Sequence, residues 1–302
     1  MEPTATIQFE HSRSPIEAVR LQRLGAYDPT IGWRGDVLWR CCRTPYGPGS
    51  MRVRWTPSRG RVEGEAWGRG GPWLAAQAFS MLGGADDPDA FQPAAASIRR
   101  LSRRRQDVAL GRAARVFDTV VSYVLQQRVR FTEAAASWGR VVRWVNEPAP
   151  GPLGLLLPPT PQQWSAISPA QLASFGIDAA RGRTVHEVAR LARRIDALAG
   201  LPGSEVGDRL EAIRGIGPWT AAMVRAVAMG DADAVPVGDW SIPSLVASAL
   251  AGEARADDAR MLDLLRPYQP HRFRLIRLLM ADGHRYQRRG PRRAEPHRRL
   301  VR

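Results

Sequence analysis

The pattern of hydrophobic and polar positions changes character near residue 95. Before this point, short segments rich in aromatic and β-branched residues are separated by turn clusters such as residues 45–49, which is typical of strands joined by turns. The segments that we interpret as strands are residues 37–39, 51–55 and 61–63. A helix over residues 72–82, ended by Gly83, is expected after them.

Beyond residue 95 the hydrophobic spacing becomes helical. Apolar residues between positions 116 and 125 recur every three or four residues, which predicts a helix with one buried face. Thr160 and Ser168 each stand before a proline, the arrangement of a helix cap followed by a first-turn proline. Asp178 is expected to open one long helix that reaches Gly200.

These patterns predict a mostly α protein with three parts. We expect an N-terminal α+β lobe over residues 1–95, a helical core over residues 96–285, and a disordered tail over residues 286–302, where arginine and proline dominate. A chain of 302 residues of which 44% are hydrophobic is long enough to bury more than one core.

The charge of the chain favours an anionic partner. The net charge is +15, and nucleic acid is the commonest polyanion that a basic protein binds. All 44 basic residues are arginine, so a general bias of the composition toward arginine explains part of this charge. The charge alone therefore supports DNA binding only modestly.

Localisation is expected to be cytoplasmic, with association to the nucleoid and no contact with a membrane. No segment approaches the roughly 18 apolar residues of a membrane helix, and the first residues lack the pattern of a signal peptide. The two cysteines, Cys41 and Cys42, are neighbours in a predicted strand and would point to opposite faces. They predict neither a disulfide framework nor a metal cluster.

The most informative segment covers residues 210–221, with the sequence LEAIRGIGPWTA. It predicts a helix, a tight glycine turn and a second helix that Pro218 begins. Gly215 and Gly217 let the backbone come close to a partner, and the second helix presents unpaired amides at its N-terminus. Such a hairpin suits a DNA phosphate and does not read base sequence.

A Gly-Asp pair follows this hairpin at Gly238 and Asp239. With it, the segment resembles the helix-hairpin-helix superfamily of DNA glycosylases, and is most similar to the AlkA-type 3-methyladenine DNA glycosylases. The similarity continues in residues 160–164 and 124–127 and covers roughly residues 110–285. It implies that the helical core has two lobes and that the N-terminal lobe is an antiparallel sheet like that of TATA-binding proteins.

The resemblance also assigns roles at the reaction centre. Asp239 matches the catalytic aspartate, and Trp219 matches the aromatic residue that faces the flipped base; Trp240 is expected beside it. Asp239 has an alternative role as the cap of the next helix. Because Ser241 is an equally good cap, we expect the Asp239 carboxylate to be free.

Further positions match the DNA-binding parts of the family. Gln127 matches the glutamine before the wedge that fills the gap left by the flipped base, and Arg128 stands at the wedge itself, where an apolar residue is usual. Arg128 is expected either to enter the base stack or to contact a phosphate. The residues expected to bind the backbone are Gly215, Ile216, Gly217 and Thr220. Carbonyls of Arg214 and Ile216 are expected to hold a monovalent cation, Na⁺ or K⁺.

The resemblance implies a reaction that starts base excision repair. A damaged base, expected to be alkylated, is flipped from double-stranded DNA, and an ionised aspartate stabilises the oxocarbenium-like sugar while water attacks. Bifunctional members use a lysine in the helix after the hairpin, where this chain has Trp219, and the chain contains no lysine. A monofunctional hydrolase is therefore expected. With only two cysteines the chain lacks the four-cysteine motif of an iron–sulfur cluster, so no such cluster is expected. The protein is expected to be a monomer.

Two other classes of function compete with this reading. The hairpin alone would also serve a non-catalytic helix-hairpin-helix DNA-binding protein, against which Asp239 argues. An RNA-binding module would fit the charge and the arginine-rich tail, but the chain shows none of the aromatic motifs of such modules.

Overall fold

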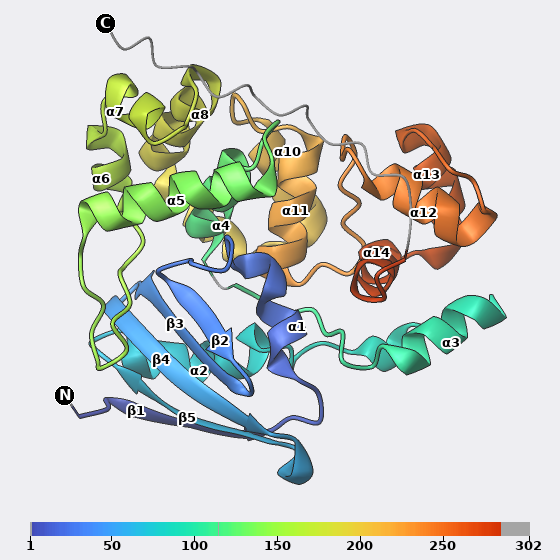
Figure 1. Ribbon diagram of the computed structural model, residues 1–302, viewed down its shortest axis with the longest axis horizontal. Helices are drawn as coiled ribbons and strands as arrows, with labels where there is room; N and C mark the ends of the chain where they lie inside the picture. Colours follow the sequence, from blue (N-terminus) through green and yellow to red (C-terminus); the bar gives the residue numbers. More distant parts are fainter. Residues whose placement is uncertain (1, 114, 285–302) are drawn as a thin grey trace, which may run out of the picture.

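A sheet lobe and two helical groups lie side by side in the computed structural model, which describes residues 2–113 and 115–284 (Figure 1). This arrangement confirms the predicted mostly α fold with an N-terminal α+β lobe. The tail predicted over residues 286–302 lies outside the described residues. Within the described part of the chain, no helix has the length and apolar character needed to cross a membrane.

The N-terminal lobe is built on one antiparallel sheet with the strand order β1-β5-β4-β3-β2. Its strands are β1 (Ala5–Glu10), β2 (Ile31–Arg34), β3 (Val37–Thr44), β4 (Gly47–Thr56) and β5 (Arg61–Trp67). The three predicted strand segments all fall inside β3, β4 and β5. The turn predicted over residues 45–49 is shorter in the structure. Thr44 already pairs with Gly47, so only Pro45 and Tyr46 form the turn. Helix α2 (Gly71–Met81) covers one face of the sheet and buries Leu74 in the same core cluster as Met51.

The two cysteines occupy opposite faces of β3, as the alternation of a strand predicts. Cys42 belongs to the core beneath α2, whereas Cys41 packs on the other face against Leu155 and Leu157. Both thiols are free, and burial raises the pKa of each, to about 11 for Cys42. The cysteines therefore stay protonated and act as small core residues.

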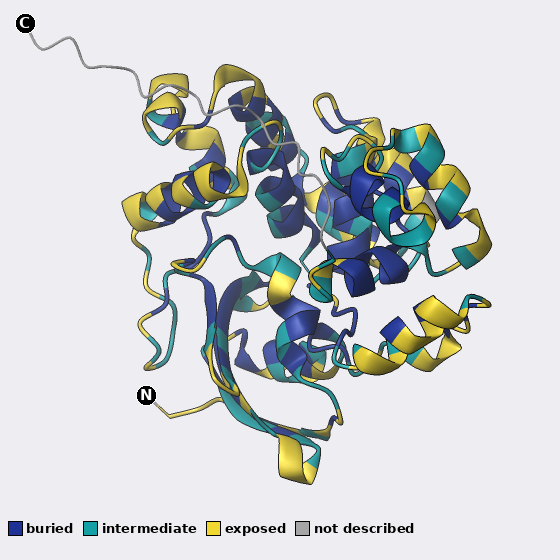
Figure 2. Ribbon diagram, turned by 45° about the vertical axis from the view of Figure 1, so that its right-hand side comes forward, coloured by how far each residue is buried: buried dark blue, intermediate teal, exposed yellow. Residues whose placement is uncertain are grey.

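The helices pack around two further buried hydrophobic clusters. The faces of the helices that point to these clusters are buried, and the opposite faces are exposed (Figure 2). The helices are α1 (Pro15–Val19), α3 (Ala96–Arg104), α4 (Val116–Leu125), α5 (Phe131–Val145), α6 (Pro161–Ala166), α7 (Pro169–Ser174), α8 (Ala179–Arg190), α9 (Ala192–Asp196), α10 (Gly203–Glu211), α11 (Pro218–Met229), α12 (Ile242–Ala251), α13 (Asp258–Leu265) and α14 (Arg272–Ala281). One cluster contains residues of α4, α5, α8 and α11, and the other joins α3 to α12, α13 and α14.

Three predicted helix starts are confirmed. Thr160 and Ser168 cap α6 and α7, each in a capping box with the glutamine three residues later. Asp178 caps α8, where its Oδ1 accepts hydrogen bonds from the amides of residues 180 and 181 at 2.9 and 3.0 Å. These caps are local features, so the sequence alone predicts them well.

The prediction of one long helix from Asp178 to Gly200 is wrong. The helix stops at Arg190, and a bend at Leu191 separates it from α9 and from a short 3₁₀ turn, Ala197–Gly200. The bend brings Asp196 to the start of α4, where its carboxylate accepts the Phe117 amide at 3.1 Å and pairs with Arg115 at 3.0 Å. This contact joins residues about 80 positions apart, which helical periodicity does not reveal.

Candidate active site

The glycine hairpin between α10 and α11 has two glycines with different tasks. Gly215 has a φ of +94°, and a Cβ at this position would lie 2.1 Å from the Thr184 hydroxyl, so the fold itself requires glycine. Gly217 has a φ of −110°, and a Cβ there would meet no atom within 4 Å. Gly215 therefore shapes the turn, while Gly217 keeps the surface before Pro218 open to a partner.

The turn between α4 and α5 is tied to this hairpin by Gln127. Its Nε2 donates hydrogen bonds to the Gly215 carbonyl at 3.0 Å and to the Thr220 hydroxyl at 2.9 Å. Thr220 is only 2% exposed. The side chains of Gln127 and Thr220, both expected at the DNA, thus bind each other and hold two segments together.

Arg128 stands in the turn after α4 with a φ of +58°, the left-handed region that non-glycine residues rarely adopt. The residue is exposed and lines the same cleft as the hairpin. The unfavourable backbone conformation of Arg128 places this residue at the cleft. The hydrogen bonds of the neighbouring Gln127 help to maintain that conformation.

The loop that carries the Gly-Asp pair is fastened by three carboxylates. The contacts are Asp231 with Arg225 (2.6 Å), Asp233 with Arg272 (2.6 Å) and Asp258 with the amide of Gly238 (3.0 Å). Gly238 has a φ of +92°, so glycine suits this position. The loop is thereby fixed to α11, α13 and α14, and the position of the next residue is fixed with it.

The carboxylate of Asp239 caps α12, which corrects the expectation that Ser241 would do so. Its Oδ1 accepts hydrogen bonds from the Ser241 amide (2.8 Å), the Ser241 hydroxyl (3.1 Å) and the Ile242 amide (3.0 Å). Ser241 makes no side-chain cap of its own. Ser241 keeps the N-cap position, but its hydroxyl donates to Asp239, and the carboxylate accepts the first amides of α12 because it is the stronger acceptor.

The second oxygen of Asp239 accepts a hydrogen bond from the indole of Trp219. The distance between Trp219 Nε1 and Asp239 Oδ2 is 2.9 Å. Four donors and the positive end of α12 thus surround a partly exposed carboxylate. The result is a negative charge of fixed orientation, which suits stabilisation of a cation held in front of it.

Hairpin, turn and aspartate line one cleft of about 930 Å³. Trp219 and Trp240, the two residues expected at the base, both line it, and Trp240 is 56% exposed. Sequence reasoning missed several apolar residues that also line it, among them Phe131 at the start of α5 and Met280 on α14. Met280 gives no sequence signal, because it lies among apolar residues of α14 that face the core.

The side chain of Ile216 lies in the helical core, 5% exposed, so only its backbone is available at the turn. The Ile216 amide donates to the Ile213 carbonyl at 3.0 Å, which closes the turn next to Arg214. Binding of Na⁺ or K⁺ by the carbonyls of Arg214 and Ile216 stays a prediction.

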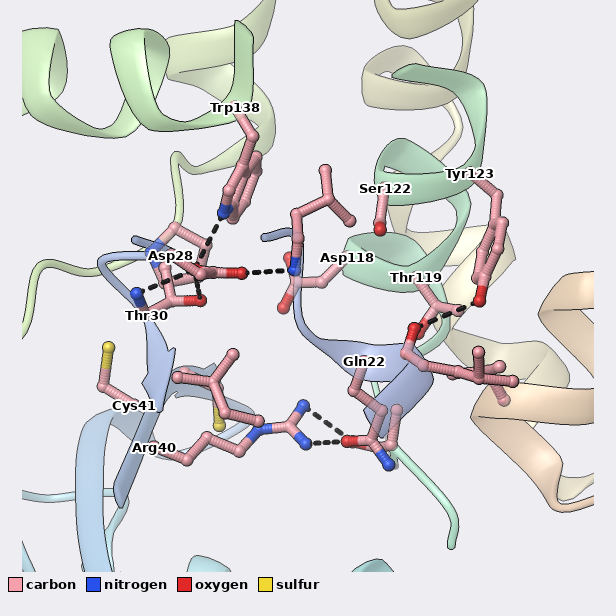
Figure 3. A pocket seen from close by; sticks show the side chains of 17 residues that line it. Gln22, Asp28, Thr30, Arg40, Cys41, Asp118, Thr119, Ser122, Tyr123 and Trp138 are labelled. Atoms are coloured by element: carbon pink, nitrogen blue, oxygen red, sulfur yellow. Dashed lines mark hydrogen bonds between the residues drawn. The ribbon is translucent and has the colours of Figure 1, made fainter. Parts of the chain in front are cut away.

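A second, smaller cavity of about 50 Å³ lies behind α4, between this helix and the sheet lobe (Figure 3). Asp28 dominates one side of it and accepts hydrogen bonds from Leu24 (2.7 Å), Thr30 (2.9 Å) and the Trp138 indole (3.0 Å). Burial raises the pKa of Asp28 against the opposite effect of these bonds. The cavity marks the junction of the two lobes and contains none of the motif residues.

Comparison with known proteins agrees with the resemblance seen in the motifs. No family model matches the chain. Over 126 residues the chain is 34% identical to the "probable bifunctional transcriptional activator/DNA repair enzyme AlkA" of Mycobacterium tuberculosis. This stretch is 40% of the chain and 25% of that protein, so the chain spans about a quarter of the length of the curated relatives it matches.

Solved structures are similar over most of the chain. A 3-methyladenine DNA glycosylase from Archaeoglobus fulgidus has a TM-score of 0.78 at 18% identity, covering 93% of this chain and 98% of its own. An 8-oxoguanine glycosylase/lyase of Clostridium acetobutylicum, in complex with double-stranded DNA, has a TM-score of 0.64 at 9% identity over 94% and 99% of the two chains. The 3-methyladenine DNA glycosylase of Schizosaccharomyces pombe reaches 0.53 at 17% identity over 65% and 96%. The chain has the fold of the helix-hairpin-helix DNA glycosylases and, in its motifs, resembles their AlkA-type members.

Proposed function

We propose that this protein is a monofunctional DNA glycosylase that flips an alkylated base out of damaged duplex DNA and hydrolyses its N-glycosidic bond. The observation that carries this proposal is the shared cleft, in which the open hairpin at Gly217 and the oriented carboxylate of Asp239 face the same space. The AlkA-type relatives and the helix-hairpin-helix fold support the same activity.

The geometry of the cleft suits the chemistry of base release. A phosphate bound at the hairpin, near the N-terminus of α11, would place the sugar of the flipped nucleotide in front of Asp239. The bond to the base breaks as positive charge develops on the sugar, and the carboxylate stabilises that charge and orients water. An alkylated purine is itself cationic, so the exposed face of Trp240 attracts it.

The hydrolytic route is favoured over a lyase route by the composition of the chain. Strand cleavage by a bifunctional enzyme needs an amine that forms a Schiff base with the sugar. The sequence contains no lysine, and Trp219 occupies the position of the lysine in the helix after the hairpin. The product is therefore expected to be an abasic strand that stays intact until it is treated with hot alkali.

The experiment compares Asp239→Asn with the unaltered protein on duplexes that each carry one lesion, under single-turnover conditions. We expect base release to fall by roughly 100-fold or more, with DNA affinity largely retained, because the charge acts on the transition state. The matched control is Asp257→Asn, which alters a helix-capping aspartate of α13 outside the cleft.

Three outcomes would contradict the proposal. Near-normal cleavage by Asp239→Asn would remove this residue from catalysis. A high yield of a protein–DNA adduct trapped by borohydride would show a lyase. Binding without base release from any duplex would favour a non-catalytic helix-hairpin-helix protein.

A further inference from the structure

The catalytic carboxylate proposed above is connected to the N-terminal lobe through two aromatic side chains. The Trp219 indole donates its only N–H to Asp239. The ring of Tyr123, from α4, meets the Trp219 ring in a T-shaped contact, with centroids 5.8 Å apart and planes at 72°. Tyr123 therefore restrains the tilt of the indole that holds the carboxylate.

The hydroxyl of Tyr123 is in turn anchored outside the helical core. It donates a hydrogen bond to the Leu21 carbonyl at 3.1 Å. Figure 3 shows the Tyr123 side chain beside the cavity between the lobes. Tyr123 is 3% exposed, and burial raises its pKa, so the hydroxyl stays a donor at every physiological pH. Leu21 belongs to the 3₁₀ turn Arg20–Gln22 of the N-terminal lobe.

This turn is itself held in place by a buried ion pair. Glu17, one turn earlier in α1, pairs with Arg277 of α14 at 3.3 Å, and the two side chains are 10% and 3% exposed. Arg20 also pairs with Glu17, at 2.6 Å. The carbonyl that receives the Tyr123 hydroxyl is therefore carried by a segment fixed to both lobes.

We propose that Trp219 and Tyr123 are positioning residues through which the N-terminal lobe orients the Asp239 carboxylate. Three hydrogen bonds hold Oδ1 of Asp239 in place, but they leave the carboxylate group able to turn about this oxygen. The hydrogen bond from the Trp219 N–H to Oδ2 fixes the plane of the carboxylate. This inference rests on the proposed function, because it concerns the orientation of the residue that stabilises the sugar. It assigns a task in catalysis to a lobe of which no described residue lines the cleft.

The test replaces Trp219 by 3-benzothienylalanine, which keeps the shape of the two rings and has sulfur in place of the N–H. The matched control places the same analogue at Trp138, whose indole also donates to a carboxylate, Asp28 at 3.0 Å, away from the cleft. Base release under single-turnover conditions, DNA affinity and thermal unfolding are measured for both proteins and for Tyr123→Phe.

We expect the analogue at Trp219 to slow base release roughly 10-fold to 100-fold, since a misplaced reacting group costs about this much, with affinity unchanged. The analogue at Trp138 should cleave at the rate of the unaltered protein, even if its unfolding temperature falls. Tyr123→Phe, which loses one hydrogen bond, should slow release between about twofold and tenfold. An unchanged rate with the analogue at Trp219 would overturn the proposal.

A readout that needs no catalysis separates this inference from the proposed function. The indole N–H of Trp219 is identified in nitrogen-15 spectra by its loss in Trp219→Phe. It should exchange slowly with solvent, and faster in Tyr123→Phe and in Asp239→Ala. Equal exchange rates in the unaltered protein, in Tyr123→Phe and in Asp239→Ala would refute the proposed positioning role. An unaltered protein that releases no base would instead refute the proposed function alone.

Discussion

Among single residues, Asp239 combines the cap of α12 with the charge of the cleft, and the sequence did not reveal this combination. Both Asp239 and Ser241 are good cap residues, and local rules rank them equally. In the structure, Asp239 Oδ1 accepts the amides of Ser241 and Ile242, while its Oδ2 accepts the indole N–H of Trp219, 20 positions earlier. A side chain that appeared free for catalysis is therefore oriented by the same bonds that begin a helix.

Arg128 combines an unfavourable backbone conformation with an expected role at the DNA. A left-handed backbone costs a non-glycine residue about 1 kcal/mol, and this strain persists at an exposed position on the cleft. Arg128→Gly should therefore raise the free energy of unfolding by about 1 kcal/mol and lower activity. Arg128→Ala keeps the strain and removes the guanidinium alone, so unfolding in urea distinguishes the two effects.

The same Arg128→Ala variant decides between the two roles expected for the arginine. A wedge that enters the base stack predicts a smaller fluorescence change from 2-aminopurine beside the lesion, with little change in salt dependence. A phosphate contact predicts a slope of log affinity against log salt that is shallower by about one unit while flipping persists. A variant that changes neither quantity would contradict both roles.

At the scale of elements, the sequence predicted what depends on neighbouring residues. The caps at Thr160, Ser168 and Asp178 and the start of α11 at Pro218 follow local rules, and all are confirmed. The break in the helix after Asp178 escaped prediction because it serves a distant contact of Asp196. The Gln127 bridge escaped for the same reason, since it joins the turn after α4 to a hairpin 88 residues later.

The hairpin offers a test in which protein packing and DNA contact can be separated. Gly217→Val places a side chain in open space, so the fold should remain intact while the phosphate is excluded. We expect the affinity for DNA to fall about tenfold to a hundredfold for damaged and undamaged duplexes alike, because hydrogen bonds from backbone amides to the charged phosphate are lost.

The control for this test is Gly200→Val, which adds the same side chain to open space at the 3₁₀ turn Ala197–Gly200, outside the cleft. It should bind every duplex normally. Gly215→Ala should instead destabilise the protein, because its Cβ would collide with Thr184. A loss of affinity confined to one lesion in Gly217→Val would place the hairpin at the base and not at the phosphate.

At the scale of the whole molecule, the lobes are joined by ion pairs that no periodicity reveals. Asp86 and Arg274 pair across 188 positions, and the two side chains are 6% and 3% exposed. Together with the pair between Glu17 and Arg277, this contact fixes α14 to the N-terminal lobe. The sequence predicted the sheet and the helices but not this docking, which depends on residues far apart in the chain.

Removing one partner of such a pair should be costly. Arg274→Met leaves the Asp86 carboxylate buried without its cation, so we expect the free energy of unfolding to fall by about 3–5 kcal/mol. Adding Asp86→Asn, which keeps an acceptor for the Leu110 amide, should recover most of the loss. If the double variant is as unstable as the single one, the ion pair is not the source of the effect.

The Gln127 bridge has a consequence for how such a protein would search a genome. Because it ties the Arg128 turn to the hairpin that we expect to bind phosphate, both would travel along the duplex as one rigid unit. As the protein slides along the duplex, Arg128 would then stay at a constant distance from the base pairs, and no separate closing motion would be needed at each step. The time spent at a site would depend on how readily the base pair opens, and a weakened pair would stop the protein before any chemistry begins.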